Sequence, residues 1–270
     1  MKKSILAALV FSLLLGLSPL AADSTVKRGI DVFTTPADGK TFYDFAQNPI
    51  PAGFFCSGSE AFTGRIAFKG LPLVTRVPGQ LRSTDTVVER LDDAVFNAKG
   101  TATTRIQFRA LSLVSIAPLK TACGAFHAYV SLSGKQRVTT MNIQRTKQGG
   151  GSFAAPLAAD IRLTFIPVKP VHGKNARKLS MTGRFIFPAT SIPWSFTEGA
   201  KTLNTVVVDT NGDQIPDRSL PGLSNFFPGR SPSAPRTALV YCCYEYICHA
   251  GDGCQHCSWQ YPPNCTAECP

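Results

Sequence analysis

The sequence has few of the residues, and none of the short motifs, on which many enzyme classes depend. It contains four histidines and two tryptophans among 270 residues. There is no Gly-x-Ser-x-Gly elbow for a serine nucleophile, no His-Glu-x-x-His helix for zinc and no glycine-rich loop to hold phosphate. No long stretch repeats its apolar residues with the period of a helix. These absences argue against motif-defined hydrolases, metalloproteases and nucleotide-binding enzymes, and against a helical fold.

An apolar run at the N-terminus has the features of an export signal. Lys2 and Lys3 precede the apolar residues 5–17, and the small-residue stretch 18–22 follows them. This order is typical of a secretory signal peptide, and the run is too short to span a bilayer. We therefore predict cleavage after Ala22, a secreted or periplasmic location, and a protein that is not integral to the membrane.

Export decides how the nine cysteines are interpreted, because an oxidising compartment lets disulfide bonds form and persist. In a strand, Cys242 and Cys243 would point to opposite faces. One of them could reach the main body, toward Cys56 or Cys123, while the other crosslinks the C-terminal segment to itself. Nine is odd, so at least one thiol is free, metal-bound or paired with another chain. The cysteines predicted to form disulfides are Cys56, Cys123, Cys242, Cys243, Cys248, Cys254, Cys257, Cys265 and Cys269.

The C-terminal cysteines also permit a metal site as an alternative to disulfides. Four thiolates or imidazoles placed around one ion are the usual ligands of structural zinc. A carrier of zinc or copper could use Cys254, Cys257 and His256. A thioredoxin-like redox centre is disfavoured, because residues 254–257 lack the βαβ context of such motifs. The full set of alternative metal ligands is Cys254, Cys257, Cys265, Cys269, His249 and His256.

The body of the chain alternates apolar and polar residues with the period of a strand. Ile106 and Phe108 alternate with Arg105 and Gln107, and the same pattern recurs in 62–69, 126–133, 161–165 and 179–187. Gly- and Pro-containing turns separate these stretches. Strands that bury one face and wet the other are typical of antiparallel sheets. We therefore predict an all-β fold, an antiparallel β-sandwich of immunoglobulin-like or jelly-roll kind.

Composition divides the chain into four parts. We predict a signal peptide at 1–22 and the β-sandwich domain at 23–220. Residues 221–237 are rich in Pro, Gly and Ser and should form an extended linker. Residues 238–270 should form a small disulfide-rich module, because about thirty residues cannot bury enough core without crosslinks.

The charge of the chain is strongly positive, with 28 Lys and Arg residues against 17 Asp and Glu residues and a net charge of +11. Residues 240–270 contain acidic residues and no Lys or Arg, so the body is the more basic part. A positive body favours an anionic partner such as a cell-surface polymer or glycan. Nucleic acid is disfavoured by export and by the absence of a basic stripe interleaved with aromatic residues.

Oxygen-bearing side chains alternate through residues 209–217, around Gly212, which permits a sharp bend. Calcium takes six to eight oxygen ligands, which such a loop can supply. The stretch resembles the Asp-rich calcium loops of thrombospondin type 3 repeats and related bacterial surface spacers, over these nine residues only. That family repeats the loop in tandem and usually has Gly where Gln214 stands. The resemblance implies calcium ligands at Asp209, Asn211, Asp213, Asp217 and the carbonyl of Ile215.

Catalytic residues are harder to assemble from this sequence. Cys123 and His127 could form a nucleophile pair, but a disulfide-bonded cysteine beside a surface histidine is the simpler interpretation. Trp194 and Phe196 could form a platform for a sugar ring, although alternating apolar residues more often face a core. Glycosidases need two carboxylates across a cleft. The available acids are Glu60, Asp85, Glu89, Asp92, Asp93 and Glu198, and the adjacent Asp92 and Asp93 should point apart.

We therefore expect a non-enzymatic exported protein that binds something, or has a structural role, at the bacterial envelope or exterior. Two alternatives remain: a secreted hydrolase acting on carbohydrate or another polymer through paired carboxylates, and a metal-binding protein using the C-terminal Cys and His residues. The chain as a whole resembles uncharacterised bacterial secreted proteins that are rich in β-structure, and this likeness implies no activity.

Overall fold

The computed structural model describes residues 25–147, 149–169, 179–187, 191–196 and 205–228, together with the backbone of two short strands nearer the C-terminus. Within these residues every regular element is a strand, and the pairs are antiparallel, which confirms the predicted all-β fold. No helix among them is long and apolar enough to cross a membrane. The predicted signal peptide, residues 1–22, lies outside the described residues.

The described residues of the main unit form seventeen strands, most of them short. Their bounds are β1 Thr25–Val26, β2 Gly29–Phe33, β3 Phe42–Asp44, β4 Arg65–Gly70, β5 Thr86–Arg90, β6 Ala94–Val95, β7 Thr101–Ser115, β8 Leu119–Thr121, β9 Gly124–Leu132, β10 Val138–Lys147, β11 Gly150–Ala154, β12 Leu157–Pro167, β13 Leu179–Phe187, β14 Ile192–Phe196, β15 Val206–Val208, β16 Arg218–Leu220 and β17 Phe226–Pro228. Gly and turn residues separate them, as the sequence predicts.

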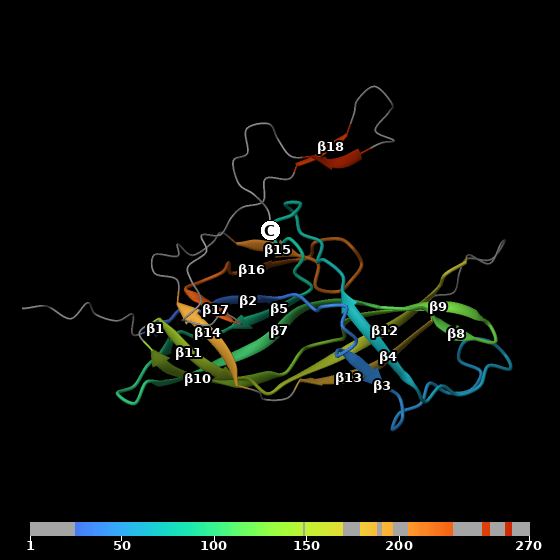
Figure 1. Cartoon of the computed structure of the whole chain (residues 1–270), viewed down its shortest axis with the longest axis horizontal. Helices are drawn as coiled ribbons and strands as arrows, with labels where there is room; N and C mark the ends of the chain where they lie inside the picture. The colour runs from blue at the N-terminus through green and yellow to red at the C-terminus, as the bar shows by residue number, and fades with distance from the viewer. Residues whose placement is uncertain are drawn as a thin grey trace, which may run out of the picture. The chain divides into compact units, whose positions relative to one another are not determined.

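The long strand β7 is shared by two halves of one sheet. Its first part pairs with β5 and β10, and its last part pairs with β4 and β9. One half has the order β2-β5-β7-β10-β11-β14-β17, and the other has the order β3-β4-β7-β9-β12-β13. Figure 1 shows β10, β11 and β14 on one side of β7, and β4, β9 and β12 on the other.

A β-bulge lets β7 serve both halves. Val87 of β5 pairs with Ala110 and Val88 pairs with Phe108, so Arg109 is the extra residue on β7. Before the bulge Ile106 and Phe108 contribute to the main core, whereas after it Leu111 and Leu113 do, and Ala110 faces the second core. A bulge shifts the alternation by one residue and re-aims the side chain that it carries. The side chain re-aimed here is Arg109.

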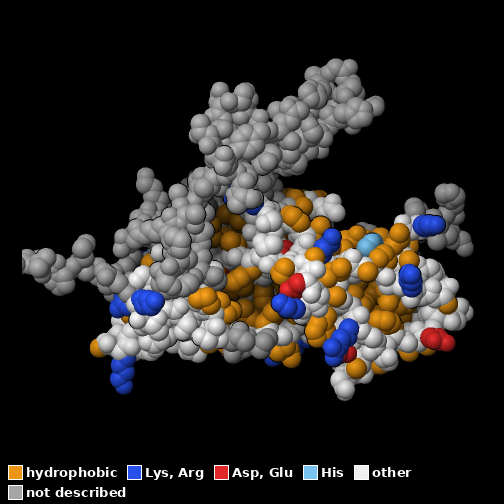
Figure 2. Space-filling view, viewed as in Figure 1, with side chains coloured by type: hydrophobic (Ala, Val, Ile, Leu, Met, Phe, Trp, Pro, Cys, Tyr) orange, Lys and Arg blue, Asp and Glu red, His pale blue; other side chains and the backbone are white. Residues whose placement is uncertain are grey.

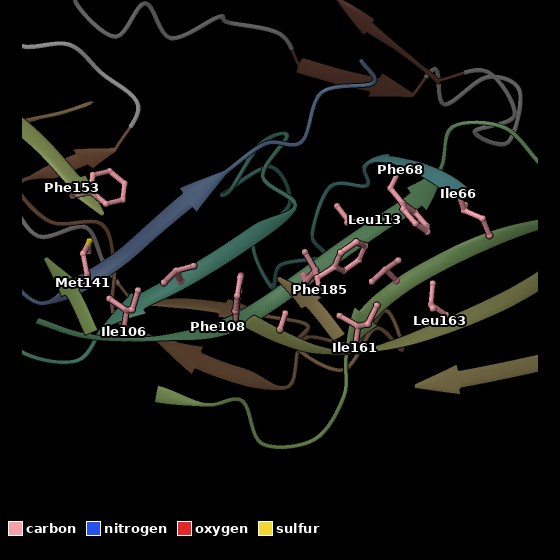
Figure 3. Close-up of a cluster of buried hydrophobic side chains, with 14 of the residues drawn as sticks. Ile66, Phe68, Ile106, Phe108, Leu113, Met141, Phe153, Ile161, Leu163 and Phe185 are labelled. Atoms are coloured by element: carbon pink, nitrogen blue, oxygen red, sulfur yellow. The ribbon is translucent and has the colours of Figure 1, made fainter. Parts of the chain in front are cut away.

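The apolar faces of the two halves enclose a core. Figure 3 shows Ile66 and Phe68 of β4, Leu113 of β7, and Ile161 and Leu163 of β12 among its side chains. Most of the residues that the alternation places on the core face are indeed buried there. Because apolar area removed from water stabilises the folded state by roughly 25 cal/mol per Å², this core holds the two halves together.

A second, smaller core lies under the hairpin formed by β15 and β16. Val206 and Val208 of β15 and Leu220 of β16 pack against Val87 of β5 and Ala110 of β7. The hairpin is therefore docked by its apolar residues. Its connecting loop is the segment 209–217, which the sequence singles out for calcium.

The two cysteines of the body form a disulfide bond with each other. Cys56 follows β3, and Cys123 lies between β8 and β9, with a distance of 5.9 Å between their Cα atoms. The pairing confirms two of the predicted disulfide cysteines. It also corrects the expectation that Cys242 or Cys243 reaches Cys56 or Cys123, because both partners in the body are already bonded.

The chain divides into two compact units, residues 1–232 and 233–270. The division falls inside the stretch 221–237 that we expect to be a linker. Residues 222–228 take part in the body, since Phe226 is buried and β17 pairs with β14. In the second unit, β18 (Glu245–Cys248) and β19 (Cys257–Gln260) pair antiparallel, with Cys248 opposite Cys257.

Candidate functional site

The loop 209–217 is closed by its own hydrogen bonds. The buried carboxylate of Asp209 accepts the N–H groups of Asn211 at 3.0 Å, Gly212 at 2.7 Å and Gln214 at 2.7 Å. Asp217 accepts both the N–H and the hydroxyl of Thr210, at 2.9 and 3.0 Å. These bonds replace the water that the backbone donors lose on folding.

The remaining calcium candidates are exposed in the same loop. Asn211 Oδ1 accepts the N–H of Asp213, and Asp213 Oδ1 accepts the N–H of Ile215, both at 2.8 Å. Within the part of the chain that the structure describes, no group of three His, Cys, Asp or Glu side chains converges in the manner of a metal site. Calcium binding at Asp209, Asn211, Asp213, Ile215 and Asp217 stays a prediction.

Gln214 has a backbone conformation that glycine would favour. Its φ is +72°, in the left-handed region where a side chain costs free energy. This is the position at which the resembled calcium loops usually carry Gly. Gln214 therefore adopts a backbone conformation for which glycine is better suited.

A pocket of about 400 Å³ lies where this loop meets the sheet. Thr210, Asn211 and Arg218 of the hairpin form one side. The other side comes from β7, from the end of β9 and from the turn that follows it, with Gln107, Phe108, Arg109, Leu132, Gly134, Lys135 and Gln136. Three widely separated segments thus meet at one cavity.

The lining of the pocket is cationic. Arg109, Lys135 and Arg218 contribute positive charge, and none of the lining residues is an acid. Arg109 is held by the carboxylate of Glu89, which lies 2.5 Å from its Nε and behind the lining. Among the residues that the structure describes, Lys135 and Arg218 have no carboxylate partner. Two unneutralised cations in one concave site favour an anionic group.

Buried glutamines fix the turn that carries Lys135. Gln136 accepts the N–H of Asp160 at 3.0 Å and donates to the Asp160 carbonyl at 2.9 Å. Gln107 in turn donates to the carbonyl of Gln136 at 2.6 Å. Because these buried amides bond the backbone on both sides of the turn, the turn between β9 and β10 is held against β7. The pocket is therefore preformed on this side.

The carboxylates considered for hydrolysis are engaged by other groups. Arg105 binds Asp92 at 2.7 and 2.8 Å and holds the pKa of Asp92 below its usual range. The N–H of Arg28 lowers the pKa of Asp93, and Lys27 adds to this effect. The two adjacent acids therefore bind different partners. Asp85 is buried, Glu60 is exposed, and Glu198 lies outside the described residues.

The candidate nucleophile Cys123 carries no thiol, because it is bonded to Cys56. His127 instead lies 3.1 Å from the hydroxyl of Ser115 through its Nδ1 atom. This pair was not suggested by the sequence, because twelve residues separate its members. Ser115 is buried, and its Oγ also accepts the N–H of Ala128 at 3.1 Å. A hydroxyl so enclosed is not presented to a substrate, and the pair serves the β7–β9 contact.

Trp194 is a core residue. It is fully buried between Phe96 and Phe226, with ring centroids 5.9 and 5.1 Å away. Its indole N–H donates to the carbonyls of Gln144 and Ser152. Phe196 packs edge-on against the same indole at 4.7 Å. These rings stabilise the first half of the sheet and cannot act as a platform for a sugar.

The alternative metal ligands lie almost entirely outside the described residues, and of them the structure describes only the backbone of Cys257. The predictions for His249, His256, Cys254, Cys265 and Cys269 therefore stay predictions.

Comparison of the chain with protein-family models, with curated proteins and with solved structures finds no match.

Proposed function

We propose that the chain is an exported, non-enzymatic bacterial binding protein, and that the cationic pocket takes an anionic group of a surface polymer or glycan. The observation that carries the proposal is the pocket lining, in which Arg109, Lys135 and Arg218 occur without an acid. A carboxylate, sulfate or phosphate group would be attracted by the two cations that no carboxylate neutralises.

The arrangement of charge supports a local site over a diffuse one. Figure 2 shows Lys and Arg side chains dispersed over the face in view, with no stripe that a nucleic-acid backbone could follow. Dispersed charges attract an anionic polymer only weakly at physiological salt, where the Debye length is about 8 Å. A concave site adds a hydrogen-bond donor, here the side-chain amide of Asn211, which can bind an oxyanion directly.

Binding of acidic and neutral polysaccharides tests this function. We expect polygalacturonate and dextran sulfate to bind the full chain in isothermal titration calorimetry, and uncharged dextran not to bind. Substitution of both pocket cations, Lys135→Gln with Arg218→Gln, should weaken binding by about tenfold or more, equivalent to about 1.4 kcal/mol. The matched control is Lys120→Gln with Arg162→Gln, which removes the same charge from exposed positions outside the pocket.

The control pair decides between the pocket and overall charge. An equal loss of affinity in both double variants would show that net charge alone attracts the polymer, and the assignment to the pocket would be wrong. Failure of every acidic polysaccharide to bind the unaltered chain would reject the proposed ligand class. Release of reducing sugar from any of these polymers would instead favour the hydrolase alternative.

A further inference from the structure

Each half of the sheet curls until its outermost strands face each other, and the first half is closed by hydrogen bonds. Ile30 of β2 donates its N–H to the carbonyl of Gly222 at 3.2 Å. The side chain of Asn225 accepts the N–H of Lys27 at 3.0 Å. The buried guanidinium of Arg90 adds a bond to Ser224 Oγ at 2.8 Å and an ion pair with Asp31 at 3.0 Å.

The second half is closed by side chains instead. Its outermost strands are β3 and β13, and among the described residues no backbone hydrogen bond joins them. The contact is made by Tyr43 of β3, whose ring packs edge-on against Phe185 at 5.5 Å. A Cβ atom at Gly183 would lie 2.6 Å from the Tyr43 hydroxyl, so this glycine makes room for the ring. Among the described residues, the backbone edge of β13 that faces away from β12 therefore has no strand partner.

A groove of about 940 Å³ runs along this edge. One wall is formed by Tyr43 and by residues 47–49 of the loop that follows β3. The other wall comes mainly from β13, with residues 181–184 and Ile186, and is extended by Asp160 and Ile161 of β12 and by Ser133. Ile186 is 76% exposed, the highest fraction among the large apolar side chains that the structure describes as exposed. The groove thus combines an open strand edge with an uncovered apolar side chain.

The edge of β13 lacks the devices that usually protect an edge strand. Its nine residues include no proline and no lysine. Its one charged side chain, Arg184, is bonded to Asp160 of β12 at 2.7 Å. In an antiparallel pair, alternate residues turn their N–H and C=O groups away from the neighbouring strand. Along β13 those groups lie on the side away from β12.

We propose that this groove binds an extended peptide segment of a partner protein, which adds to β13 as a further strand. Only a peptide backbone offers the alternating donors and acceptors that an open strand edge requires. The charged residues of the lining, Asp160 and Arg184, neutralise each other, so the central part of the peptide is uncharged. A second copy of this chain is disfavoured as the occupant, because two bodies of a chain with net charge +11 repel each other.

This groove shares no lining residue with the anion pocket, so each proposal can be tested without the other. The peptide would cover Ile186 and complete the second half of the sheet in the way that residues 222–225 complete the first. A strand of about five to nine residues matches the length of β13. Affinity would come from the backbone, and specificity from the side chains that face Ile186 and Tyr43.

The first test is amide hydrogen exchange of the full chain by NMR. We expect alternate amides of β13 to exchange rapidly in the protein alone and to become protected when peptide is added. The probes are four capped eight-residue peptides that alternate Thr with Val, Thr with Ile, Thr with Tyr and Ser with Leu. At least one should bind, and its fully N-methylated form, which keeps the side chains but has no N–H donors, should bind about tenfold more weakly or worse.

Variants connect the binding to the edge of β13. Ile186→Lys introduces an edge-protecting charge and should weaken the peptide by about tenfold or more. The control Val138→Lys places the same residue at an exposed position of β10, outside the groove, and should leave binding unchanged.

Four results would overturn the proposal: protection of every β13 amide in the protein alone, no binding by any of the four peptides, equal binding of the N-methylated form, or equal loss in both lysine variants. Dimerisation in light scattering that Ile186→Lys abolishes would identify a second copy as the occupant and reject a peptide partner.

Discussion

Asp85 is a buried carboxylate without a positively charged partner among the described residues. Its oxygens accept the N–H of Thr35 at 2.5 Å, the Thr35 hydroxyl at 3.0 Å and the Thr86 hydroxyl at 2.5 Å. A Cβ at Gly70 would lie 2.0 Å from Asp85 Oδ2, so the carboxylate fills the space left by that glycine. Burial raises the pKa of Asp85 above its usual range, and the threonine hydrogen bonds oppose this only in part.

The raised pKa predicts how stability depends on pH. The folded protein binds the Asp85 proton more tightly than the unfolded chain, so this group's contribution to the free energy of unfolding falls as pH rises from about 3.8 through the folded pKa. We expect Asp85→Asn, whose amide can still bond both threonines, to remove this dependence. Its stability relative to the unaltered protein should therefore be highest at pH 7 and decline toward pH 4, by about 1.4 kcal/mol per unit of pKa shift.

Urea unfolding between pH 4 and pH 7 measures this difference. Asp44→Asn is the control, because the N–H of Ala46 and the Arg65 side chain lower the pKa of Asp44. The stability contributed by Asp44 is present at neutral pH and is lost on acidification, so its variant should show the opposite trend. Parallel pH curves for Asp85→Asn and the unaltered protein would contradict the prediction.

Asp209 is the residue on which the hairpin loop depends most. Because it accepts three backbone N–H groups as an ion, Asp209→Ala should lower the free energy of unfolding by about 1.5–3 kcal/mol. Asp213→Ala removes one exposed bond to Ile215 and should cost about 0.5 kcal/mol or less. Urea unfolding at pH 7 compares the two. Equal losses would mean that the burial of Asp209 does not matter.

At the scale of elements, calcium should act on the β15–β16 loop as a whole. We expect millimolar calcium to raise Tm relative to a chelator, by about 2–4 °C for each kcal/mol of binding free energy. Asp213→Ala should abolish the shift, because it removes a predicted calcium ligand. The variant is a clean test, because this exposed acid contributes little to the stability of the loop without calcium. Differential scanning calorimetry measures both, and the same Tm of the unaltered protein with calcium and with chelator would reject the site.

The pairing of β10 with β11 depends on close approach at one glycine. A Cβ at Gly151 would lie 2.0 Å from the carbonyl oxygen of Gln144, which is backbone and cannot move aside without parting the strands. Gly151→Ala should therefore cost about 1–3 kcal/mol or more. Gly149→Ala is the matched control, because nothing lies within 4 Å of its Cβ position. Chemical denaturation of both variants checks this, and indistinguishable curves would refute it.

Strand β7 shows which part of an element could be predicted from sequence. The alternation through Ile106 and Phe108 indicates the first half correctly, because a strand with one buried face must repeat every two residues. The second half is in the opposite phase, since Leu111 and Leu113 are buried there. The sequence carries no local sign of the bulge at Arg109, because the bulge is set by pairing with β5.

At the scale of the whole molecule, the Cys56–Cys123 bond spans a sequence separation of 67 residues. Closing a loop of that length limits the unfolded chain and is worth about 4 kcal/mol in the chain-entropy account. We expect the double variant Cys56→Ala with Cys123→Ala to lose stability on that scale in urea unfolding. The single variant Cys56→Ala opens the same loop and should lose a similar amount. An unchanged midpoint in the double variant would show that the bond does not stabilise the fold.

The candidate site was less predictable than the fold. The alternating oxygen-bearing side chains of residues 209–217 singled out the hairpin loop, and the two-residue period of apolar side chains predicted the all-β architecture. Arg109, Lys135 and Arg218 each resemble any other polar position of a strand or turn. They become a site only when β7, the β9–β10 turn and the hairpin meet. Such contacts between distant segments cannot be predicted from the local sequence of any one of them. The open edge of β13 is hidden for the same reason, since an edge is defined by the absence of a neighbour.

The closure of the first half by residues 222–225 has a consequence for biogenesis. Ile30 finds its partner Gly222 only after nearly the whole body has left the ribosome. Contacts of such long sequence separation form slowly, because the ends of a long chain must first meet. The first half of the sheet should therefore close only after synthesis of the body is nearly complete.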